Sequence, residues 1–444
     1  YNLLHLHLTD DEGWRIEIKS FPNLTKKGAF NVKKIGRFTE FSKPEPNEPR
    51  DFGGFFTQDD IRELVKYAKD RFVDIMPEID VPGHSMAAVA SYPELSCTPE
   101  AVNYQVISGE PFIDWSTDHA IALQDNTLCP ANEKVYTFLD KVFGEVSELF
   151  PFEYIHMGGD ENAKNNWEKS SDVQNLMKKE KLKDQHEVQS YFVKRVEKII
   201  NSKGKKLMGW DEILEGGLPG NAAVMSWRGM EGGIEAAKQN HKVVMTPNNY
   251  AYIDFYQGEV SAEGKVYKGL RMKKTYEFEP LPAGVDPSLI LGGQANLWSE
   301  QILNIRSAQY MTWPRSMAIA EAMWSPKDKR NWSSFSNKVE KQFDMLDALQ
   351  IKYAKSIYDP IVTTVSNTKD ELIASMEGEI DNLKFYYTID ESLPDQYSTE
   401  YSTPFIVPND VTILRVISYR NGKVIGKMLN IPIESLKQRA KKIL

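Results

Sequence analysis

Two adjacent carboxylates, Asp160 and Glu161, follow a pair of glycines at the end of a short apolar segment. Neighbouring strand residues normally point to opposite faces, so both side chains reach one substrate only where the strand ends and the backbone bends. Gly158-Gly159 gives the backbone that freedom. Burial and mutual repulsion would raise the pKa of one carboxyl group, leaving one acid and one carboxylate. This pair suits glycoside cleavage, which needs a proton donor and stabilisation of an oxocarbenium-like centre.

Further carboxylates and aromatic side chains follow other short apolar segments. They are Asp10, Asp11, Glu78, Asp80, His84, Trp210, Asp211, Glu212, Trp227, Tyr252, Asp254, Trp298 and Glu300. Each alone has a plain structural explanation, because carboxylates often cap helices and tryptophans often fill cores. Together they favour an uncharged, polyhydroxylated ligand, since aromatic rings stack on a sugar's apolar faces and carboxylates accept its hydroxyl groups.

The segments that must position these residues predict a parallel β/α fold, because each is followed by helical periodicity. The seven segments are residues 2–9, 73–80, 154–161, 206–212, 222–227, 243–254 and 289–300. Helices are expected between them, as at residues 57–71, where Thr57 can cap the first turn, and at 186–202. A (β/α)8 barrel closes with eight strands and gathers their ends on one catalytic face. We therefore expect a TIM-type barrel whose first strand is missing from this chain.

The connection at residues 81–152 is longer than usual, and we expect it to cap the face that holds the carboxylates. It contains both cysteines of the chain, Cys97 and Cys129. Because the connection shows few signs of regular structure, a covalent tie would stabilise it considerably, and we expect these cysteines to form a disulfide.

The sequence pattern of short apolar segments followed by helical periodicity ends at about residue 349. Alternation predicts β-strands at residues 383–390 and 412–419, the second followed by an Asn421-Gly422 turn. We therefore expect an α/β barrel domain at residues 1–349 and a small β-sandwich domain at residues 350–444.

Composition narrows the class of partner. The chain of 444 residues carries a net charge of −9 and no basic tract, which disfavours nucleic acid and anionic membranes as partners. No apolar run approaches the roughly 18 to 20 residues that cross a bilayer. No set of His, Cys and carboxylate residues has metal-ligand spacing, so we expect no metal and no cofactor.

Six motifs closely resemble those of glycoside hydrolase family 20, in order, from residue 1 to about residue 345. They are His5-Leu6-His7-Leu8-Thr9-Asp10-Asp11-Glu12-Gly13-Trp14-Arg15, Pro77-Glu78-Ile79-Asp80-Val81-Pro82-Gly83-His84, His156-Met157-Gly158-Gly159-Asp160-Glu161, Gly209-Trp210-Asp211-Glu212, Tyr252-Ile253-Asp254 and Trp298-Ser299-Glu300. The tail looks like the β-sandwich attached to many bacterial members. Members carry an Arg at the end of the first barrel strand and usually an α/β domain before it. Neither is present, so we expect an incomplete chain, with a gap or a replacement segment beside residues 2–9.

The resemblance implies an exo-acting β-N-acetylhexosaminidase that removes terminal N-acetylglucosamine or N-acetylgalactosamine from glycans. The sugar's own acetamido oxygen would attack the anomeric carbon, with Glu161 as general acid and then base. Asp160 would accept the acetamido N–H, and Tyr252 would donate to the acetamido oxygen. The residues that would bind or position the substrate are His84, Asp10, Trp210, Trp227, Asp254, Trp298 and Glu300. In this group His84 and Asp10 would form a polar relay to Glu161, while Asp254 and Glu300 would hold hydroxyls.

Three alternatives remain open. An enzyme of the same family that releases a disaccharide would keep every motif but need a roomier pocket. A conventional glycosidase would use Asp211 or Glu300 as nucleophile. A non-catalytic sugar-binding protein is the third, although the intact Asp160-Glu161 pair argues against it. An exported enzyme is the expectation in each enzymatic case, in the periplasm or outside the cell, with oligomeric state left open.

Overall fold

The computed structural model describes residues 1–116, 120–263 and 266–442. The chain divides into two compact units, the first Tyr1–Met245 with Leu281–Gly292 and the second Thr246–Pro280 with Gly293–Leu444. The domain boundary after residue 349 stays a prediction. Within the described residues, no helix has both the length and the apolar character that a bilayer crossing requires.

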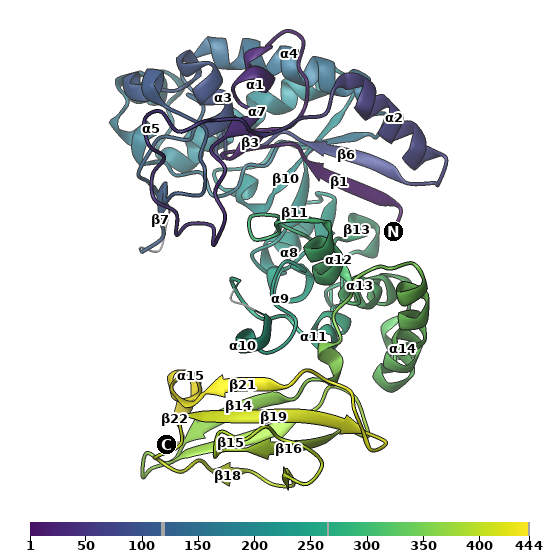
Figure 1. The fold of residues 1–444 in the computed structure, drawn as a ribbon. Helices are drawn as coiled ribbons and strands as arrows, with labels where there is room; N and C mark the ends of the chain where they lie inside the picture. Colours follow the sequence, from purple (N-terminus) through teal and green to yellow (C-terminus); the bar gives the residue numbers. More distant parts are fainter. Residues whose placement is uncertain (117–119, 264–265, 443–444) are drawn as a thin grey trace. The chain divides into compact units, whose positions relative to one another are not determined.

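A seven-stranded sheet forms the centre of the first unit (Figure 1). Its strands, in spatial order, are β1 (Leu3–His7), β6 (Asp74–Glu78), β9 (Tyr154–His156), β10 (Lys206–Trp210), β11 (Ala223–Ser226), β12 (Val243–Met245) and β13 (Ile290–Gly293). Each strand lies inside one of the seven predicted segments, and the pairs from β1 to β12 are parallel. Spatial order follows chain order, as in a TIM-type barrel. In the described part of the chain β1 and β13 stand at the ends of this order, as the count of seven strands predicts.

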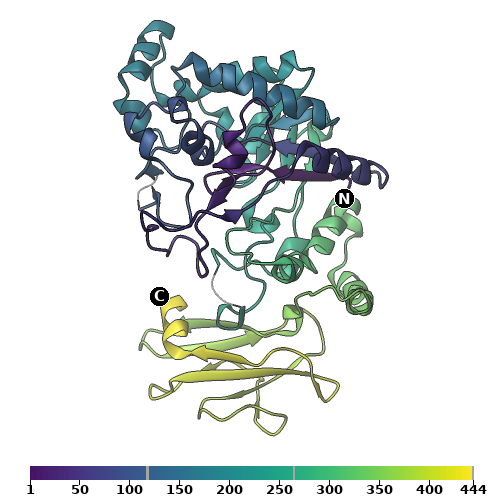
Figure 2. The same ribbon diagram turned by 45° about the horizontal axis from the view of Figure 1, so that its top comes forward.

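Helices form a layer against these strands (Figures 1 and 2). Helix α2 (Gln58–Lys69) begins as predicted, because the Thr57 side chain accepts from the Asp60 N–H and Asp60 accepts from the Thr57 N–H. Helix α7 (Gln185–Ser202) also matches its predicted position. It buries Val188, Phe192, Val196 and Ile200, a spacing that turns one apolar face inward.

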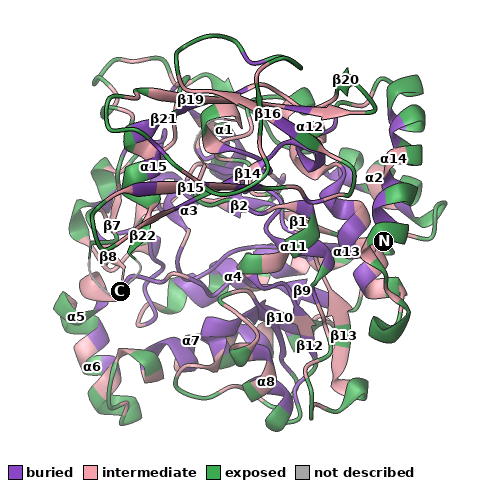
Figure 3. Ribbon diagram, turned by 90° about the horizontal axis from the view of Figure 1, so that it is seen from below, coloured by how far each residue is buried: buried purple, intermediate pink, exposed green. Residues whose placement is uncertain are grey.

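The expectation of little regular structure in the connection at 81–152 was wrong. This connection contains α3 (Met86–Ser91), short strands β7 (Ile113–Asp114) and β8 (Ile121–Ala122), and the 17-residue helix α4 (Glu133–Leu149). Figure 3 colours the ribbon by burial, with buried residues in purple. Val135, Leu139, Val142 and Val146 form a buried stripe on α4. That periodicity was present in the sequence and should have predicted a helix.

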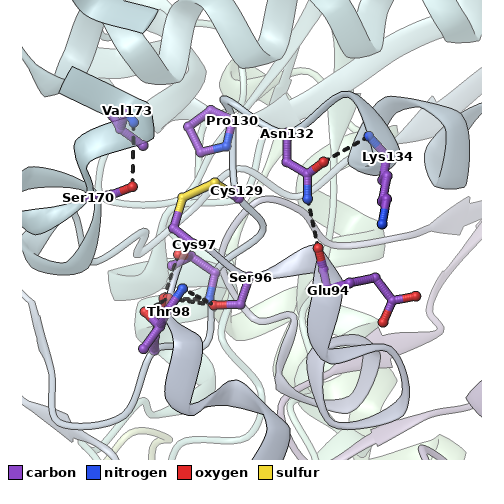
Figure 4. The surroundings of a disulfide bond; sticks show 12 residues. Glu94, Ser96, Cys97, Thr98, Cys129, Pro130, Asn132, Lys134, Ser170 and Val173 are labelled. Carbon is purple, nitrogen blue, oxygen red and sulfur yellow. Dashed lines mark hydrogen bonds between the residues drawn. A yellow bond between two sulfur atoms is a disulfide. The ribbon is translucent and has the colours of Figure 1, made fainter. Parts of the chain in front are cut away.

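Cys97 and Cys129 form the predicted disulfide (Figure 4). The backbone N–H of Cys129 also donates to the Leu95 carbonyl at 2.8 Å. The disulfide and this hydrogen bond therefore connect the segment around Cys97 to the residues just before α4. Together these links fix the connection that follows β6.

We expect the double substitution Cys97→Ser and Cys129→Ser to lower the free energy of unfolding by roughly 3 to 4 kcal/mol, since the bridge spans 32 residues. Urea unfolding without reductant, compared with wild type under the same conditions, measures this loss. A loss below about 1 kcal/mol would show that the bridge adds little constraint to the unfolded chain.

The second unit contains α13 (Arg315–Trp324), α14 (Trp332–Ala348) and two C-terminal sheets. One sheet has the order β18 (Phe405–Ile406), β15 (Leu372–Glu377), β14 (Ile361–Ser366), β22 (Lys441–Lys442). The other has the order β17 (Thr399–Glu400), β16 (Lys384–Thr388), β19 (Ile413–Arg420), β20 (Lys423–Val424), with β21 (Leu429–Pro432) also on β19. Strands β16 and β19 and the Asn421-Gly422 turn match their predicted positions.

Candidate functional site

The Asp160-Glu161 pair lies on a turn after β9 that an ordinary backbone would not form. Gly158 and Gly159 have φ values of 71° and 96°, and Glu161 itself has a φ of 45°. A Cβ atom on Gly158 would lie 1.7 Å from Oδ1 of Asp80, so this position requires glycine. The bend brings both carboxylates to one side, as the sequence predicts, at a cost in backbone strain at Glu161.

His84 lies between the pair and two further carboxylates. Its Nδ1 is 3.1 Å from Oδ1 of Asp10 and 3.2 Å from Oδ2 of Asp11. Its Nε2 is 3.7 Å from Oδ2 of Asp160 and 3.5 Å from Oε2 of Glu161. Burial alone would lower the pKa of His84, but the surrounding carboxylates outweigh burial and raise the pKa well above its usual value. The imidazole therefore links Asp10 to Glu161 and carries a positive charge.

The pKa of Asp160 is raised well above its usual value. Burial is the main cause, and the charges of Asp80, Glu212 and Glu78 add to it, while His84 opposes them. The sequence predicts one raised pKa, but the resemblance makes Glu161 the acid. The Asp160 side chain is 12% exposed, and this burial is the main cause of its raised pKa, while the Glu161 side chain is 31% exposed. A cluster with this many carboxyl groups favours a positive centre in whatever binds beside it.

Two tryptophans of the first unit, Trp210 and Trp227, are held by carboxylates. Trp210 is buried, and its Nε1 donates to Oε1 of Glu78 at 2.9 Å. Trp227 is partly exposed, and its Nε1 donates to Oε2 of Glu212 at 3.0 Å. Burial raises the pKa of Glu212 well above its usual value, with the charge of Asp211 adding to the effect. The two indoles thus have fixed orientations, which suits the walls of a pocket.

The remaining predicted residues form a second group, in the second unit. The rings of Tyr252 and Trp298 lie with centroids 6.3 Å apart. Asp254 is 3% exposed, and burial raises its pKa to about 7, with the charge of Glu300 adding to the effect. Tyr267 donates to Oε1 of Glu300 at 3.5 Å. This group offers hydroxyl and carboxyl groups beside an aromatic surface.

Sequence reasoning assigned no individual role to His5 and His7 of the first unit or to the two carboxylates, Glu78 and Asp80, that face them. Nε2 of His5 is 2.9 Å from Oε2 of Glu78, and Nε2 of His7 is 3.4 Å from Oδ2 of Asp80. Asp80 also accepts a hydrogen bond from the Gly159 N–H at 3.3 Å, so it contacts the turn that carries Asp160 and Glu161. The alternations His5-Leu6-His7 and Glu78-Ile79-Asp80 could have found them, since residues two apart share a strand face.

Four sets of three possible metal ligands lie in the described residues, each with donor atoms within 4.8 Å of one another. They are His5-Glu78-His156, His7-Glu78-Asp80, Asp10-Asp11-His84 and Asp80-His84-Asp160. Each set draws on more than one segment, so spacing along the chain did not reveal them. Within each set a histidine ring nitrogen lies within 4.0 Å of a carboxylate oxygen. That no metal is needed stays a prediction.

Comparison with known proteins identifies the family. The model of the glycosyl hydrolase family 20 catalytic domain matches residues 1–327, and a model described as Fn3 associated matches residues 375–431. A beta-hexosaminidase of Porphyromonas gingivalis is 37% identical over 437 residues, which cover 96% of this chain and 52% of that protein. A beta-N-acetylhexosaminidase of Cellulomonas fimi is 30% identical, covering 80% of this chain and 63% of that protein. The chain thus spans about half the length of the first of these relatives and under two thirds of the second.

A solved structure has the same fold. The family 20 exo beta-N-acetylglucosaminidase from Vibrio harveyi, in complex with N-acetylglucosamine, matches with a TM-score of 0.68 and 35% identity. The match covers 80% of this chain and 54% of that one.

Proposed function

Because the chain belongs to glycosyl hydrolase family 20, we propose that it is an exo-acting β-N-acetylhexosaminidase. It would remove terminal N-acetylglucosamine or N-acetylgalactosamine from the non-reducing ends of glycans. The observation that carries this proposal is the strained turn that brings Asp160 and Glu161 to one side, with His84 between them and Asp10. Relatives of this chain bear the names beta-hexosaminidase and beta-N-acetylhexosaminidase, which supports the same reaction.

In the first step the acetamido oxygen of the sugar attacks the anomeric carbon while Glu161 gives its proton to the leaving oxygen. The glycosidic bond breaks, the aglycone leaves as an alcohol, and a cyclic oxazolinium ion remains. In the second step Glu161, now a carboxylate, takes a proton from water, and the resulting hydroxide opens the oxazolinium at the anomeric carbon. The charged His84, 3.5 Å from Glu161, stabilises the carboxylate between these steps.

Asp160 accepts the acetamido N–H and stabilises the positive charge that develops on the oxazolinium. Its raised pKa shows that its negative charge is costly in the pocket when nothing positive is bound. Because the cation forms only during the reaction, this interaction is stronger in the transition state than in the ground state, and it therefore raises turnover.

Trp210 and Trp227 would wall the acetamido pocket, a role that the family resemblance also implies for Trp298. Tyr252 would donate to the acetamido oxygen, and Asp254 and Glu300 would hold ring hydroxyls. The buried position of Asp254 suits this role, because a desolvated carboxyl group discriminates strongly between ligands that do and do not offer it a donor.

The conventional two-carboxylate mechanism is less well supported. Asp211, one candidate nucleophile, is 2% exposed, and its Oδ1 accepts a hydrogen bond from Nε of Arg228 at 2.6 Å. A carboxylate committed to such a pair is a poor nucleophile. We also propose that the protein acts in the periplasm or outside the cell, where the Cys97–Cys129 disulfide is stable.

Hydrolysis of p-nitrophenyl glycosides tests the proposal. We expect release of p-nitrophenol from the N-acetyl-β-glucosaminide or the N-acetyl-β-galactosaminide, and none from the matched β-glucoside, which lacks the acetamido group. Faster release from a disaccharide glycoside than from either monosaccharide would favour a disaccharide-releasing enzyme. Binding of N-acetylglucosamine without any hydrolysis would favour a sugar-binding protein.

We expect full activity in excess chelator, because the proposed steps use only side chains and the substrate. Incubation with ethylenediaminetetraacetate before the p-nitrophenyl assay measures this. Lost activity that returns on adding a divalent metal would contradict the prediction, and the His5-Glu78-His156 set would then be the first place to look.

A further inference from the structure

Glu78 is a buried carboxylate that the proposed reaction does not use. It is the last residue of β6 and is 0% exposed. Its Oε1 accepts from Nε1 of Trp210 at 2.9 Å and lies 3.0 Å from Nδ1 of His156, while its Oε2 lies 2.9 Å from Nε2 of His5. These three rings come from β10, β9 and β1, so one carboxylate joins side chains of three other strands.

Glu78 is ionised in this setting. Burial alone would raise its pKa, but His156, His7 and His5 outweigh burial and hold the pKa well below its usual value. An ionised carboxylate only accepts hydrogen bonds, so it keeps the indole N–H of Trp210 directed toward it. A charged acceptor also makes this hydrogen bond stronger than one to a neutral group.

Ring contacts complete the restraint on Trp210. The ring of His156 meets the indole edge-on with centroids 4.8 Å apart, and the ring of His5 lies 6.0 Å from it. The backbone N–H of Trp210 donates to the carbonyl of Gly158 at 2.9 Å. Trp210 is therefore fixed by its side chain to Glu78 and by its backbone to the turn that carries Asp160 and Glu161.

We propose that Glu78 is a positioning residue, which sets the plane of the Trp210 indole and thereby the size of the N-acyl group that the pocket accepts. The inference rests on the proposed function, in which Trp210 walls the acetamido pocket. Glu78 touches no reacting atom, and it acts only through the ring that it holds.

Substrates that differ only in the N-acyl group test this role. We expect Glu78→Gln to lower kcat/KM on the p-nitrophenyl N-acetyl-β-glucosaminide on the order of 10- to 100-fold, since small displacements near the reacting atoms have effects of this size. The N-propionyl substrate should lose much less, because a less restrained indole leaves room for the longer group. The acetyl-to-propionyl ratio of kcat/KM should therefore fall.

Two companion variants separate positioning from general damage. Trp210→Phe removes the indole N–H but keeps a ring, and it should also lower the acetyl-to-propionyl ratio of kcat/KM. The double variant Glu78→Gln, Trp210→Phe should show no further fall in this ratio. Glu197→Gln makes the same chemical change at a buried position of α7 and should leave the ratio unchanged.

An unchanged ratio in folded Glu78→Gln protein would overturn the inference, as would additive effects in the double variant. If Glu78→Gln does not fold, an unchanged ratio in Trp210→Phe overturns it equally. Failure of the proposed function gives a different result, because the wild-type protein would then hydrolyse neither N-acyl substrate.

Discussion

Glu161→Gln is expected to lower kcat/KM roughly 100- to 10,000-fold on substrates with poor leaving groups and far less on activated aryl glycosides. Glutamine cannot give a proton to the leaving oxygen, and only poor leaving groups need that proton. The side chain is accessible for this role, since it is 31% exposed and its Oε2 lies 3.5 Å from Nε2 of His84.

A series of aryl N-acetyl-β-glucosaminides with phenols of increasing pKa measures the effect. The plot of log kcat/KM against phenol pKa should be much steeper for the variant than for wild type. Glu153→Gln, an exposed glutamate before β9, is the matched control and should leave the plot unchanged. Equal losses across the series would refute the acid role of Glu161.

Asp160→Asn is expected to lower turnover roughly 100- to 1,000-fold, by nearly the same factor for every leaving group. The variant loses the negative charge that stabilises the oxazolinium but keeps the proton donor. The same aryl series measures this, with Asp172→Asn on the exposed side of α6 (Ser171–Glu180) as control. A loss that grows with phenol pKa would point to a role in leaving-group protonation.

The free energy of unfolding of Asp160→Asn shows whether its loss of turnover comes from the missing charge or from misfolding. The pKa of Asp160 is higher in the folded chain than its ordinary value, so the folded state loses stability as the pH rises from the ordinary value through the raised one. Asparagine stays neutral over that range. Asp160→Asn should therefore be at least as stable as wild type at neutral pH, and a marked fall in urea midpoint would contradict the burial of this charge.

The strands and the turn that carries Asp160 and Glu161 were predictable from the sequence, because both follow from local patterns. Each strand combines a short apolar run with turn residues, and Gly158-Gly159 marks the bend at Asp160 directly. The site residues of the two units were predicted from strand ends, where a β/α fold gathers its functional groups.

Other features depend on packing between distant segments. Helix α4 is an exception, because its apolar periodicity is local and a helix could have been predicted from it. The contact of Glu78 with Trp210 joins residues 132 positions apart, which no spacing rule reveals. The raised pKa of Asp160 likewise depends on Asp80 and Glu212, which reach it only in the folded chain.

The role of the substrate's own acetamido group is tested most directly by fluorinating it. The measurement is kcat/KM for p-nitrophenyl β-glucosaminides that carry acetyl, fluoroacetyl, difluoroacetyl and trifluoroacetyl groups. Each fluorine withdraws electrons from the carbonyl oxygen and weakens it as a nucleophile, so we expect kcat/KM to fall steeply and in order along the series. A flat series, together with a trapped covalent bond between the sugar and a carboxylate of the enzyme, would contradict hydrolysis by the acetamido group.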